Sequence, residues 1–302
     1  MNSLRRGVET AAVGAALVLA HLLPRRWLLA VGAGFGAFAG RVLPRRTAIV
    51  RENLTGAYGD SLPDSERERV MRACWRHFGR ITFDALAFPQ LDQASLDATI
   101  RVEGLEHARE ALAHGKGMLV FSAHYGHWEA GAYAMGLLGV PFAVIARPLD
   151  NPTLDLKLIE LRKGSGNAVI PKRRAVRETI RALARGSGVA ILIDQDAGAE
   201  GGVFVPFFGR PAATTPTLAL LALRTEAPIV PVFADVDPDG TIRVHIEPAV
   251  PTEATGDRDA DVVRVTAACT AIVERWVRKH PEQWLWMHRR WKTKPGSGAA
   301  QA

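Results

Sequence analysis

His124 and Glu129 are the two residues of this chain whose types and spacing most directly indicate chemistry. A short apolar run from Met118 to Phe121 leads through Ser122 into a polar turn with His124, and four residues separate His124 from Glu129. An imidazole has an unperturbed pKa of about 6.5, so it can take a proton from a hydroxyl near neutral pH. A carboxylate nearby can orient the ring and stabilise the imidazolium that forms. We therefore predict that His124 is a general base and that Glu129 orients it.

Other interpretations of these residues stay open. His124 alone is also typical of a hydrogen-bonded histidine in a core or a turn. His124, His127 and Glu129 could be zinc or iron ligands, but no other His, Asp or Cys cluster supplies an outer ligand set, so we expect no metal. On a continuous helix, residues five apart point about 140° away from each other, so His124 must lie on a turn before the helix. Gly126 makes such a turn easy. Glu129 could instead be a first-turn residue favoured by the helix dipole.

Strands and helices alternate along the chain at short spacing. Apolar runs predict the strands, and apolar residues at helical spacing predict the helices. The strands are expected at 118–122, 142–146, 168–170, 189–193, 229–234 and 242–246. The helices are expected at 61–90, 128–138, 152–162, 175–185, 216–225 and 259–280. This alternation predicts an α/β fold with a mixed, largely parallel central sheet flanked by helices and with an antiparallel edge.

Two further polar loops follow predicted strands, and we expect them to share one crevice with the His124 turn, because the carboxyl ends of parallel strands converge. In the first loop, Arg147 could bind a phosphate, stabilise an oxyanion or form a surface ion pair. Asn151 is a candidate for substrate binding, although a helix N-cap suits its position better. In the second loop, Asp194 and Asp196 could anchor Arg147, give His124 a second carboxylate or cap the loop.

Composition places the chain among proteins with anionic partners. It has 302 residues, 48% of them hydrophobic, with a net charge of +7 and a pI near 9.8. Such an excess of positive charge favours phospholipid surfaces, phosphorylated glycolipids, acidic carrier proteins or nucleic acid. No nucleic-acid module accompanies it, so we expect no nucleic acid. Cys74 and Cys269 lie in apolar helical patterns and indicate neither a disulfide framework nor a Cys-rich zinc site.

The N-terminus carries two apolar runs, 11–23 and 27–40, separated by Pro24-Arg25-Arg26. Each is too short to span a bilayer alone, since about 20 residues are needed. Together they could form one tilted segment or a hairpin in the interface; a cleaved signal peptide and a buried soluble hairpin are the alternatives. Flanking arginines favour a cytoplasmic, anionic surface. We expect a membrane anchor over 1–44, a catalytic domain over 45–295 and a disordered tail over 296–302.

The C-terminal region gathers basic and aromatic residues. Cations beside tryptophans suit a lipid headgroup interface. Arg289 and Arg290 are therefore candidates for substrate binding. The other members of this group are Lys292, Lys294, Trp284, Trp286 and Trp291.

Several ordered blocks of the sequence resemble one family. The blocks are His124-Tyr125-Gly126-His127-Trp128-Glu129, Arg147-Pro148-Leu149-Asp150-Asn151-Pro152 with Asp155, Asp194-Gln195-Asp196, Val203 to Gly209, and Pro281 to Lys292, after an N-terminal block with Arg45-Arg46 and Asn53-Leu54. In this order they resemble the late acyltransferases of lipid A biosynthesis (lauroyl and myristoyl transferases), within the lysophospholipid acyltransferase-like group. The match spans nearly the whole chain.

The resemblance implies a glycerol-phosphate-acyltransferase-like fold and an O-acyltransferase at the inner membrane, with its catalytic domain facing the cytoplasm. It would move a fatty acyl chain from an acyl carrier protein or coenzyme A to a hydroxyl of a membrane glycolipid, with no metal or other cofactor. Related enzymes acylate phosphatidylinositol mannosides, but the closing Arg289-Arg290-Trp291-Lys292 is more similar to the lipid A branch. A serine hydrolase is a rival reading, but the chain has no Gly-x-Ser-x-Gly elbow. A non-catalytic membrane-binding protein would leave the ordered polar loops unexplained.

Overall fold

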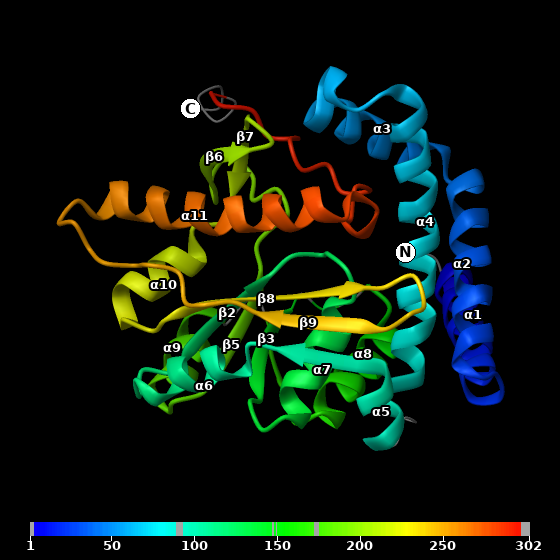
Figure 1. The fold of residues 1–302 in the computed structure, drawn as a ribbon, viewed down its shortest axis with the longest axis horizontal. Helices are drawn as coiled ribbons and strands as arrows, with labels where there is room; N and C mark the ends of the chain where they lie inside the picture. The colour runs from blue at the N-terminus through cyan, green and yellow to red at the C-terminus, as the bar shows by residue number, and fades with distance from the viewer. Residues whose placement is uncertain (1–2, 89–92, 147, 149, 172–174, 297–302) are drawn as a thin grey trace.

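The computed structural model describes residues 3–88, 93–146, 148, 150–171 and 175–296. Its first part is helical, and Figure 1 shows α1, α2 and α4 side by side at one flank of the molecule. The helices of this part are α1 (Ser3–Leu22), α2 (Arg25–Val42), α3 (Pro44–Tyr58) and α4 (Asp64–Ala87), with a 3₁₀ turn at Gly59–Ser61.

Helices α2 and α4 pack closely because glycines meet where they cross. A Cβ added to Gly36 would lie 2.0 Å from the Trp75 carbonyl oxygen, and one added to Gly79 would lie 2.1 Å from that of Gly32. Arg25 fixes the start of α2, because it donates hydrogen bonds of 2.7 and 2.6 Å to the buried Asp84 carboxylate of α4. The helix pair therefore has a buried seam, and the opposite face of α2 is largely exposed, although the ring of Phe35 contacts that of Phe83 with 5.7 Å between centroids.

A seven-stranded sheet forms the centre, in the order β1-β9-β8-β2-β5-β3-β4. Its strands are β1 (Ile100–Glu103), β2 (Met118–Ser122), β3 (Phe142–Ala146), β4 (Ala168–Pro171), β5 (Gly188–Leu192), β8 (Ile229–Val236) and β9 (Ile242–Ile246). The five strands from β8 to β4 run parallel, while β9 pairs antiparallel with β8 and β1 runs parallel to β9. The predicted largely parallel sheet with an antiparallel edge is confirmed.

Helices cover both faces of the sheet, and each strand sends alternate side chains to opposite faces. Leu119 and Phe121 of β2 join the larger core cluster, whereas Met118 and Val120 join a second one. Strands buried on both faces explain why the sequence shows continuous apolar runs. The covering helices are α5 (Gln93–Thr99), α6 (Leu105–Ala113), α7 (Trp128–Leu137), α8 (Pro152–Gly164), α9 (Ala175–Ala184), α10 (Thr217–Thr225) and α11 (Arg258–Lys279).

A separate antiparallel hairpin, β6 (Val203–Phe207) and β7 (Arg210–Thr214), was not expected from the sequence. Its two-residue turn is Phe208-Gly209, and both residues have positive φ, 52° and 67°. Such mirror-image turns match the twist of paired strands, but they usually carry Asn or Asp rather than Phe. In Figure 1 the hairpin stands on the far side of α11 from the sheet, near the C-terminal segment.

The N-terminal apolar runs form α1 and α2. No helix in the described part of the chain is by itself both long and apolar enough to cross a bilayer; α2 and the segment Pro44–Ser61 meet that standard only as a pair, bent by 93°. The six C-terminal residues 297–302 lie outside the described residues, so the expected disordered tail is left as a prediction.

Candidate active site

The register of two neighbouring strands places His124 beside Asp194. Strands β2 and β5 are parallel, and Ser122 pairs with Leu192 at their carboxyl ends. The pairing continues one residue further, since the Ile193 amide donates to the Ser122 carbonyl at 3.2 Å. Continuing the same offset of 70 residues puts His124 opposite Asp194. Two polar residues thus meet where the ladder of hydrogen bonds ends, as expected for a site in an α/β fold.

Asp194 binds His124 at two points. The His124 Nδ1 lies 2.8 Å from Asp194 Oδ1, and the His124 backbone amide donates to Asp194 Oδ2 at 2.9 Å. Because a carboxylate only accepts, Nδ1 carries the ring proton, and the lone pair of Nε2 faces the side-chain amide nitrogen of Gln195 at 3.5 Å. The His124 side chain is 21% exposed and that of Asp194 is 2% exposed. The imidazole therefore has one nitrogen bound to a buried carboxylate and the other able to accept a proton.

Electrostatics agree with this arrangement. Burial alone lowers the pKa of His124, but the charge and hydrogen bond of Asp194 outweigh it, so the pKa of His124 is raised above its ordinary value. Burial raises the pKa of Asp194, but His124 and a hydrogen bond from Trp284 outweigh it, so that pKa lies below its ordinary value. Asp194 is thus ionised near neutral pH, and the pKa of His124 lies above its ordinary value.

Glu129 does not hold the expected place beside the ring. It lies in the first turn of α7, and its carboxylate pairs with Arg162 of α8 through hydrogen bonds of 2.5 and 3.1 Å. The indole Nε1 of Trp128 also donates to it at 3.2 Å. The carboxylate that contacts His124 belongs to Asp194, and this contact was one of the roles left open for Asp194. The helix directs Glu129 towards α8, so the contact that orients the ring comes from Asp194 and not from Glu129. The charge of Glu129 still acts on His124, because it is among the causes that raise the pKa of His124.

The turn between His124 and α7 is tight, and Gly126 makes it possible. Gly126 has φ +55°, and a Cβ there would lie 1.8 Å from the Ala234 carbonyl oxygen of β8. The same oxygen accepts from the His127 amide at 2.7 Å. His127 then caps α7, because its Nδ1 accepts from the Ala130 amide at 3.3 Å.

A metal site would need the side chains of His124, His127 and Glu129 to meet at one point, but each of them contacts a different partner. The Nε2 of His127 lies 3.6 Å from Asp84 Oδ2, and burial lowers the pKa of His127 to about 3. His124 contacts Asp194, and Glu129 contacts Arg162. Within the described ranges, no three His, Cys, Asp or Glu side chains form a group that could hold a metal ion. Metal-independent chemistry stays a prediction.

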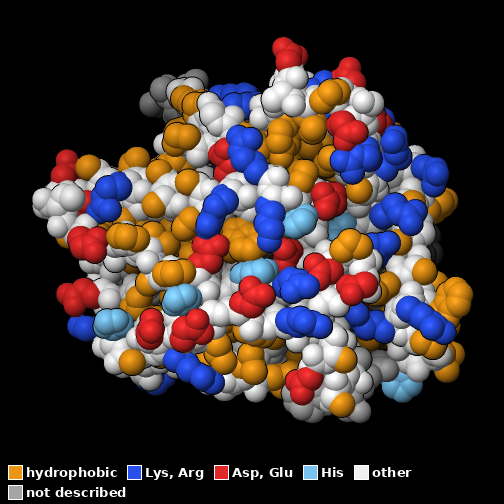
Figure 2. Space-filling view, viewed as in Figure 1, with side chains coloured by type: hydrophobic (Ala, Val, Ile, Leu, Met, Phe, Trp, Pro, Cys, Tyr) orange, Lys and Arg blue, Asp and Glu red, His pale blue; other side chains and the backbone are white. Residues whose placement is uncertain are grey.

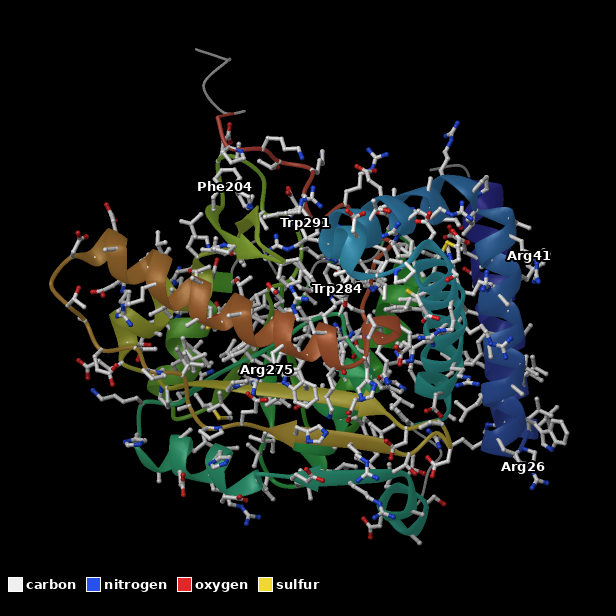
Figure 3. All side chains as sticks on the ribbon, turned by 45° about the horizontal axis from the view of Figure 1, so that its top comes forward. Arg26, Arg41, Phe204, Arg275, Trp284 and Trp291 are labelled. Carbon is white, nitrogen blue, oxygen red and sulfur yellow. The ribbon has the colours of Figure 1, made fainter. Side chains whose placement is uncertain are left out.

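A segment after α11 supports both members of the pair, and its role was not predicted. Trp284 donates from Nε1 to Asp194 Oδ2 at 2.8 Å, and the Leu285 amide donates to the His124 carbonyl at 3.0 Å. The Gln283 carbonyl accepts from the Gly126 amide at 2.8 Å. Trp284 is only 1% exposed, so its hydrogen bond to Asp194 lies out of water. In Figure 3 Trp284 lies near the centre of the molecule.

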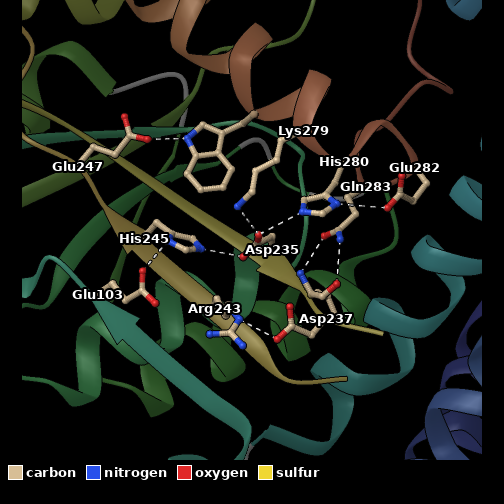
Figure 4. Close-up of polar contacts among 12 residues, drawn as sticks. Glu103, Asp235, Asp237, Arg243, His245, Glu247, Lys279, His280, Glu282 and Gln283 are labelled. Carbon is tan, nitrogen blue, oxygen red and sulfur yellow. Dashed lines mark hydrogen bonds and ion pairs between the residues drawn. The ribbon is translucent and has the colours of Figure 1, made fainter. Parts of the chain in front are cut away.

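The end of β8 is anchored to the same segment. The Gln283 side chain accepts from the Val236 amide and donates to its carbonyl, both at 2.9 Å. Beside it, Asp235 accepts from His245 at 2.8 Å and from Lys279 at 3.1 Å (Figure 4). This network joins β8, β9 and α11 around the strand that carries the Ala234 carbonyl. It therefore fixes the position of the Ala234 backbone, against which the Gly126 turn packs.

The remaining candidate residues have other surroundings. Asp196 accepts from the Thr293 amide and hydroxyl at 3.0 and 2.8 Å, and thus holds the C-terminal segment. Arg290 is 1% exposed, where burial lowers its pKa to about 10, and it donates to the Ala213 carbonyl at 2.7 Å and to the Thr214 hydroxyl. A direct contact of buried Arg290 with substrate is therefore not favoured, whereas Arg289 is exposed.

Asn151 caps α8 by accepting from the Thr153 amide at 3.2 Å, and its amide group donates to Thr10 of α1 at 3.2 Å. This agrees with the N-cap interpretation. Arg147 lies outside the described residues, so its role stays a prediction.

Comparison with known proteins gives a consistent assignment. A sequence model of the family described as bacterial lipid A biosynthesis acyltransferase matches residues 3–293. The chain is 31% identical over 275 residues to a lipid A biosynthesis lauroyltransferase of Escherichia coli (strain K12), covering 90% of this chain and 88% of that protein. It is also 31% identical over 280 residues to a lipid A biosynthesis palmitoleoyltransferase of that strain, covering 90% and 87%. A phosphatidylinositol mannoside acyltransferase of Mycolicibacterium smegmatis is 26% identical over 250 residues, covering 80% and 78%. The resemblance and the expectation of an acyltransferase are thereby confirmed, and the chain belongs to the bacterial lipid A biosynthesis acyltransferase family.

Proposed function

We propose that this protein transfers a fatty acyl chain from an acyl thioester to a hydroxyl of a lipid A precursor. The observation that carries the proposal is the His124–Asp194 pair at the carboxyl ends of β2 and β5, in a chain of this family. The donor would be an acyl carrier protein or coenzyme A, and the acceptor a membrane glycolipid. We expect no other cofactor.

In the proposed mechanism, Nε2 of His124 accepts the proton of the acceptor hydroxyl while the oxygen attacks the thioester carbonyl carbon. Asp194 stabilises the imidazolium that forms, because its buried carboxylate already faces Nδ1 at 2.8 Å. The tetrahedral intermediate then breaks its carbon–sulfur bond. The thiolate leaves and takes the proton from Nε2, so the product is an ester and a free thiol. We expect Glu129 to contribute through its contact with Arg162, which fixes the start of α7.

The test measures esterified lipid by mass spectrometry after the purified protein is mixed with an acyl thioester and a lipid A precursor. A product heavier by one acyl group is expected. His124→Ala should lose activity by roughly 10²–10⁴-fold, which is the usual contribution of a general base. The matched control is His114→Ala, an exposed histidine at the end of α6. Near wild-type transfer by pure His124→Ala would contradict the mechanism.

The acceptor and the metal requirement are tested in the same assay. A phosphatidylinositol mannoside offered in place of the lipid A precursor should be acylated more slowly; faster acylation would favour the second acceptor class, which the mycobacterial relative's name also suggests. Activity should survive chelation by EDTA. Loss of activity that one metal restores would instead favour a ligand role for His124.

We also propose that α2 rests on the cytoplasmic face of the inner membrane. Its free face carries a row of exposed apolar side chains between flanking arginines, and such a helix suits the interface of an anionic bilayer. The opposite face is packed against α4, so we favour a helix lying in the interface over one surrounded by lipid. The apolar row is Trp27 (56% exposed), Val31 (39%), Phe35 (56%), Phe38 (58%) and Val42 (52%).

Vesicle flotation tests this placement. Phe35→Ser combined with Phe38→Ser should release the protein from vesicles that contain phosphatidylglycerol. Leu156→Ser is the matched control, because Leu156 is 61% exposed on α8, away from the row. Equal binding by the double variant and the control would contradict the proposed orientation.

A further inference from the structure

An open cavity of about 520 Å³ lies in the corner between the end of α2, the start of α3 and the middle of α4. Trp75 and Met71 of α4 give it an apolar wall. Its rim is basic: Arg41 comes from α2, Arg51 from α3, and Arg72 and Arg76 from α4. We call these four residues and the cavity the arginine pocket. Figure 2 shows Lys and Arg side chains gathered over the part of the surface where Figure 1 places α3 and the adjoining end of α4.

The charges of the pocket are not balanced. Among the described lining residues, Glu68 is the one acidic residue and four are arginines. Glu68 is engaged by Arg51 at 2.5 Å and lies 4.0 Å from Arg72. Among the described side chains, Arg41 and Arg76 have no ion pair. The pocket therefore holds an excess of three positive charges, and two of its guanidinium groups can bind an anion without first losing a partner.

The position of the pocket suits a lipid headgroup. Arg41 lies at the end of α2 next to Val42 and three residues after Phe38, both in the exposed apolar row. Figure 3 shows Arg41 and Arg26 at opposite ends of α2, with side chains directed away from the fold. A lipid whose chains contacted the apolar row would bring its headgroup to the level of the pocket.

Helix α4 connects the pocket with the catalytic turn. Trp75 and Arg76 line the pocket, whereas the next residue, His77, contacts the Gly126 carbonyl oxygen through Nε2 at 3.1 Å. Arg76 and His77 are consecutive residues that point about 100° apart, given 3.6 residues per turn, so the pocket and the catalytic turn contact adjacent faces of α4. A glycolipid headgroup that reaches from one face to the next would have one end in the pocket and a hydroxyl near His124.

We propose that the arginine pocket binds a phosphomonoester of the membrane lipid that accepts the acyl chain; the identity of that lipid as acceptor rests on the proposed function. A phosphomonoester carries about −1.5 to −2 charges near pH 7 and presents three acceptor oxygens. A phosphodiester carries only one charge. Guanidinium groups bind phosphate through two parallel hydrogen bonds, which favours the more highly charged monoester.

The binding test compares two kinds of vesicle with equal surface charge. Phosphatidylcholine vesicles contain either phosphatidic acid, a phosphomonoester, or phosphatidylglycerol, a phosphodiester. The wild-type protein should prefer phosphatidic acid. Arg41→Gln combined with Arg76→Gln should lose this preference, with a fall of roughly 10–100-fold in affinity for phosphatidic acid, as expected for lost charge-assisted hydrogen bonds. Arg26→Gln combined with Arg45→Gln removes the same charge outside the pocket and should weaken binding to both vesicles equally.

Two results of the vesicle comparison would overturn the proposal. One is equal binding of wild-type protein to both kinds of vesicle. The other is the same phosphatidic acid preference in the pocket variant as in the control variant, with both shown by circular dichroism to be folded. Inorganic phosphate is added as a competitor to separate the two sources of the anion. Release of the protein by millimolar phosphate alone would assign the pocket to a soluble phosphate compound rather than a membrane lipid, and would also overturn the proposal.

Kinetics distinguish this proposal from the proposed function. With a phosphorylated glycolipid acceptor, the pocket variant should show a KM roughly 10–100-fold higher and an unchanged kcat, because it loses binding and not chemistry. An unchanged KM in an active enzyme would refute the pocket while leaving the transferase intact. Absence of transfer by the wild-type protein, with the vesicle preference still present, would refute the proposed function and leave the pocket standing as a phosphomonoester site.

Discussion

Replacement of Asp194 by Asn should reverse the tautomer of His124. In the wild-type protein, Oδ2 of Asp194 accepts from the His124 amide at 2.9 Å and from Trp284 Nε1 at 2.8 Å. Both partners are donors, so the Asn carbonyl oxygen must take this position. The Asn amide group then faces His124 Nδ1, where Oδ1 was at 2.8 Å. Nδ1 must now accept, the ring proton moves to Nε2, and the nitrogen that should take the substrate proton no longer can.

The expected loss follows from this geometry. Asp194→Asn keeps the shape and two of the three hydrogen bonds and reverses the direction of the third, so the fold should persist while general-base catalysis is lost. That contribution is roughly 10²–10⁴-fold in kcat. It corresponds to about 2.7–5.4 kcal/mol of activation free energy, at about 1.36 kcal/mol per factor of ten. The assay is the rate of ester formation with saturating acyl thioester. Thermal unfolding of the same sample confirms that the variant is folded.

A matched control lies two residues away. Asp196→Asn makes the same chemical change in the same loop, but its carboxylate holds Thr293 and not His124. It should lower activity far less than Asp194→Asn. Equal activities of the two variants, or an Asp194→Asn enzyme within a few-fold of wild type, would refute the assignment of Asp194 as the partner of His124.

Three further expectations follow from the same contacts. The kcat/KM should rise with pH through the raised pKa of His124, above the ordinary value of about 6.5, because only the neutral ring accepts a proton. The stability that protonated His124 contributes is present below that ordinary value and is lost as pH rises through the raised pKa. The stability that ionised Asp194 contributes is lost as pH falls through the lowered pKa of Asp194. Trp284→Phe removes one donor to Asp194 and should lower kcat by roughly 10–100-fold, which is the effect of one lost hydrogen bond to a charge. The acid limb of the pH profile should shift as well, and an unmoved limb would argue for a purely structural role of Trp284. Glu129→Gln should lower the free energy of unfolding by about 1.5–3 kcal/mol through its lost contact with Arg162, and a double-mutant cycle with Arg162→Met measures that coupling; coupling of Glu129 to His124 instead would restore the original pairing.

Much of the architecture could be predicted because burial determines it. Strands β3 and β9 begin and end where the apolar runs do, at 142–146 and 242–246. The ends of helix α4 were less well defined: the helix was predicted over 61–90, but it runs from Asp64 to Ala87, with Pro63 at the N-cap position and no side-chain cap. The hairpin β6–β7 was missed because its strands are short and its turn contains Phe208 in a conformation that favours other residues.

The catalytic pair shows where sequence reasoning reaches its limit. Spacing along the chain favoured Glu129, because a local separation can be read directly from the sequence. The partner of His124 is instead set by the pairing of β2 with β5, which depends on strand order and register. Both strands were predicted, and each ends two residues before a polar side chain. Pairing the predicted strands 118–122 and 189–193 end to end would have put Gln195 opposite His124, because β5 begins one residue earlier than predicted, at Gly188. Asp194 follows only from the observed register. The contribution of Trp284 could not have been found in this way, because it depends on how the segment after α11 packs back over the strand ends.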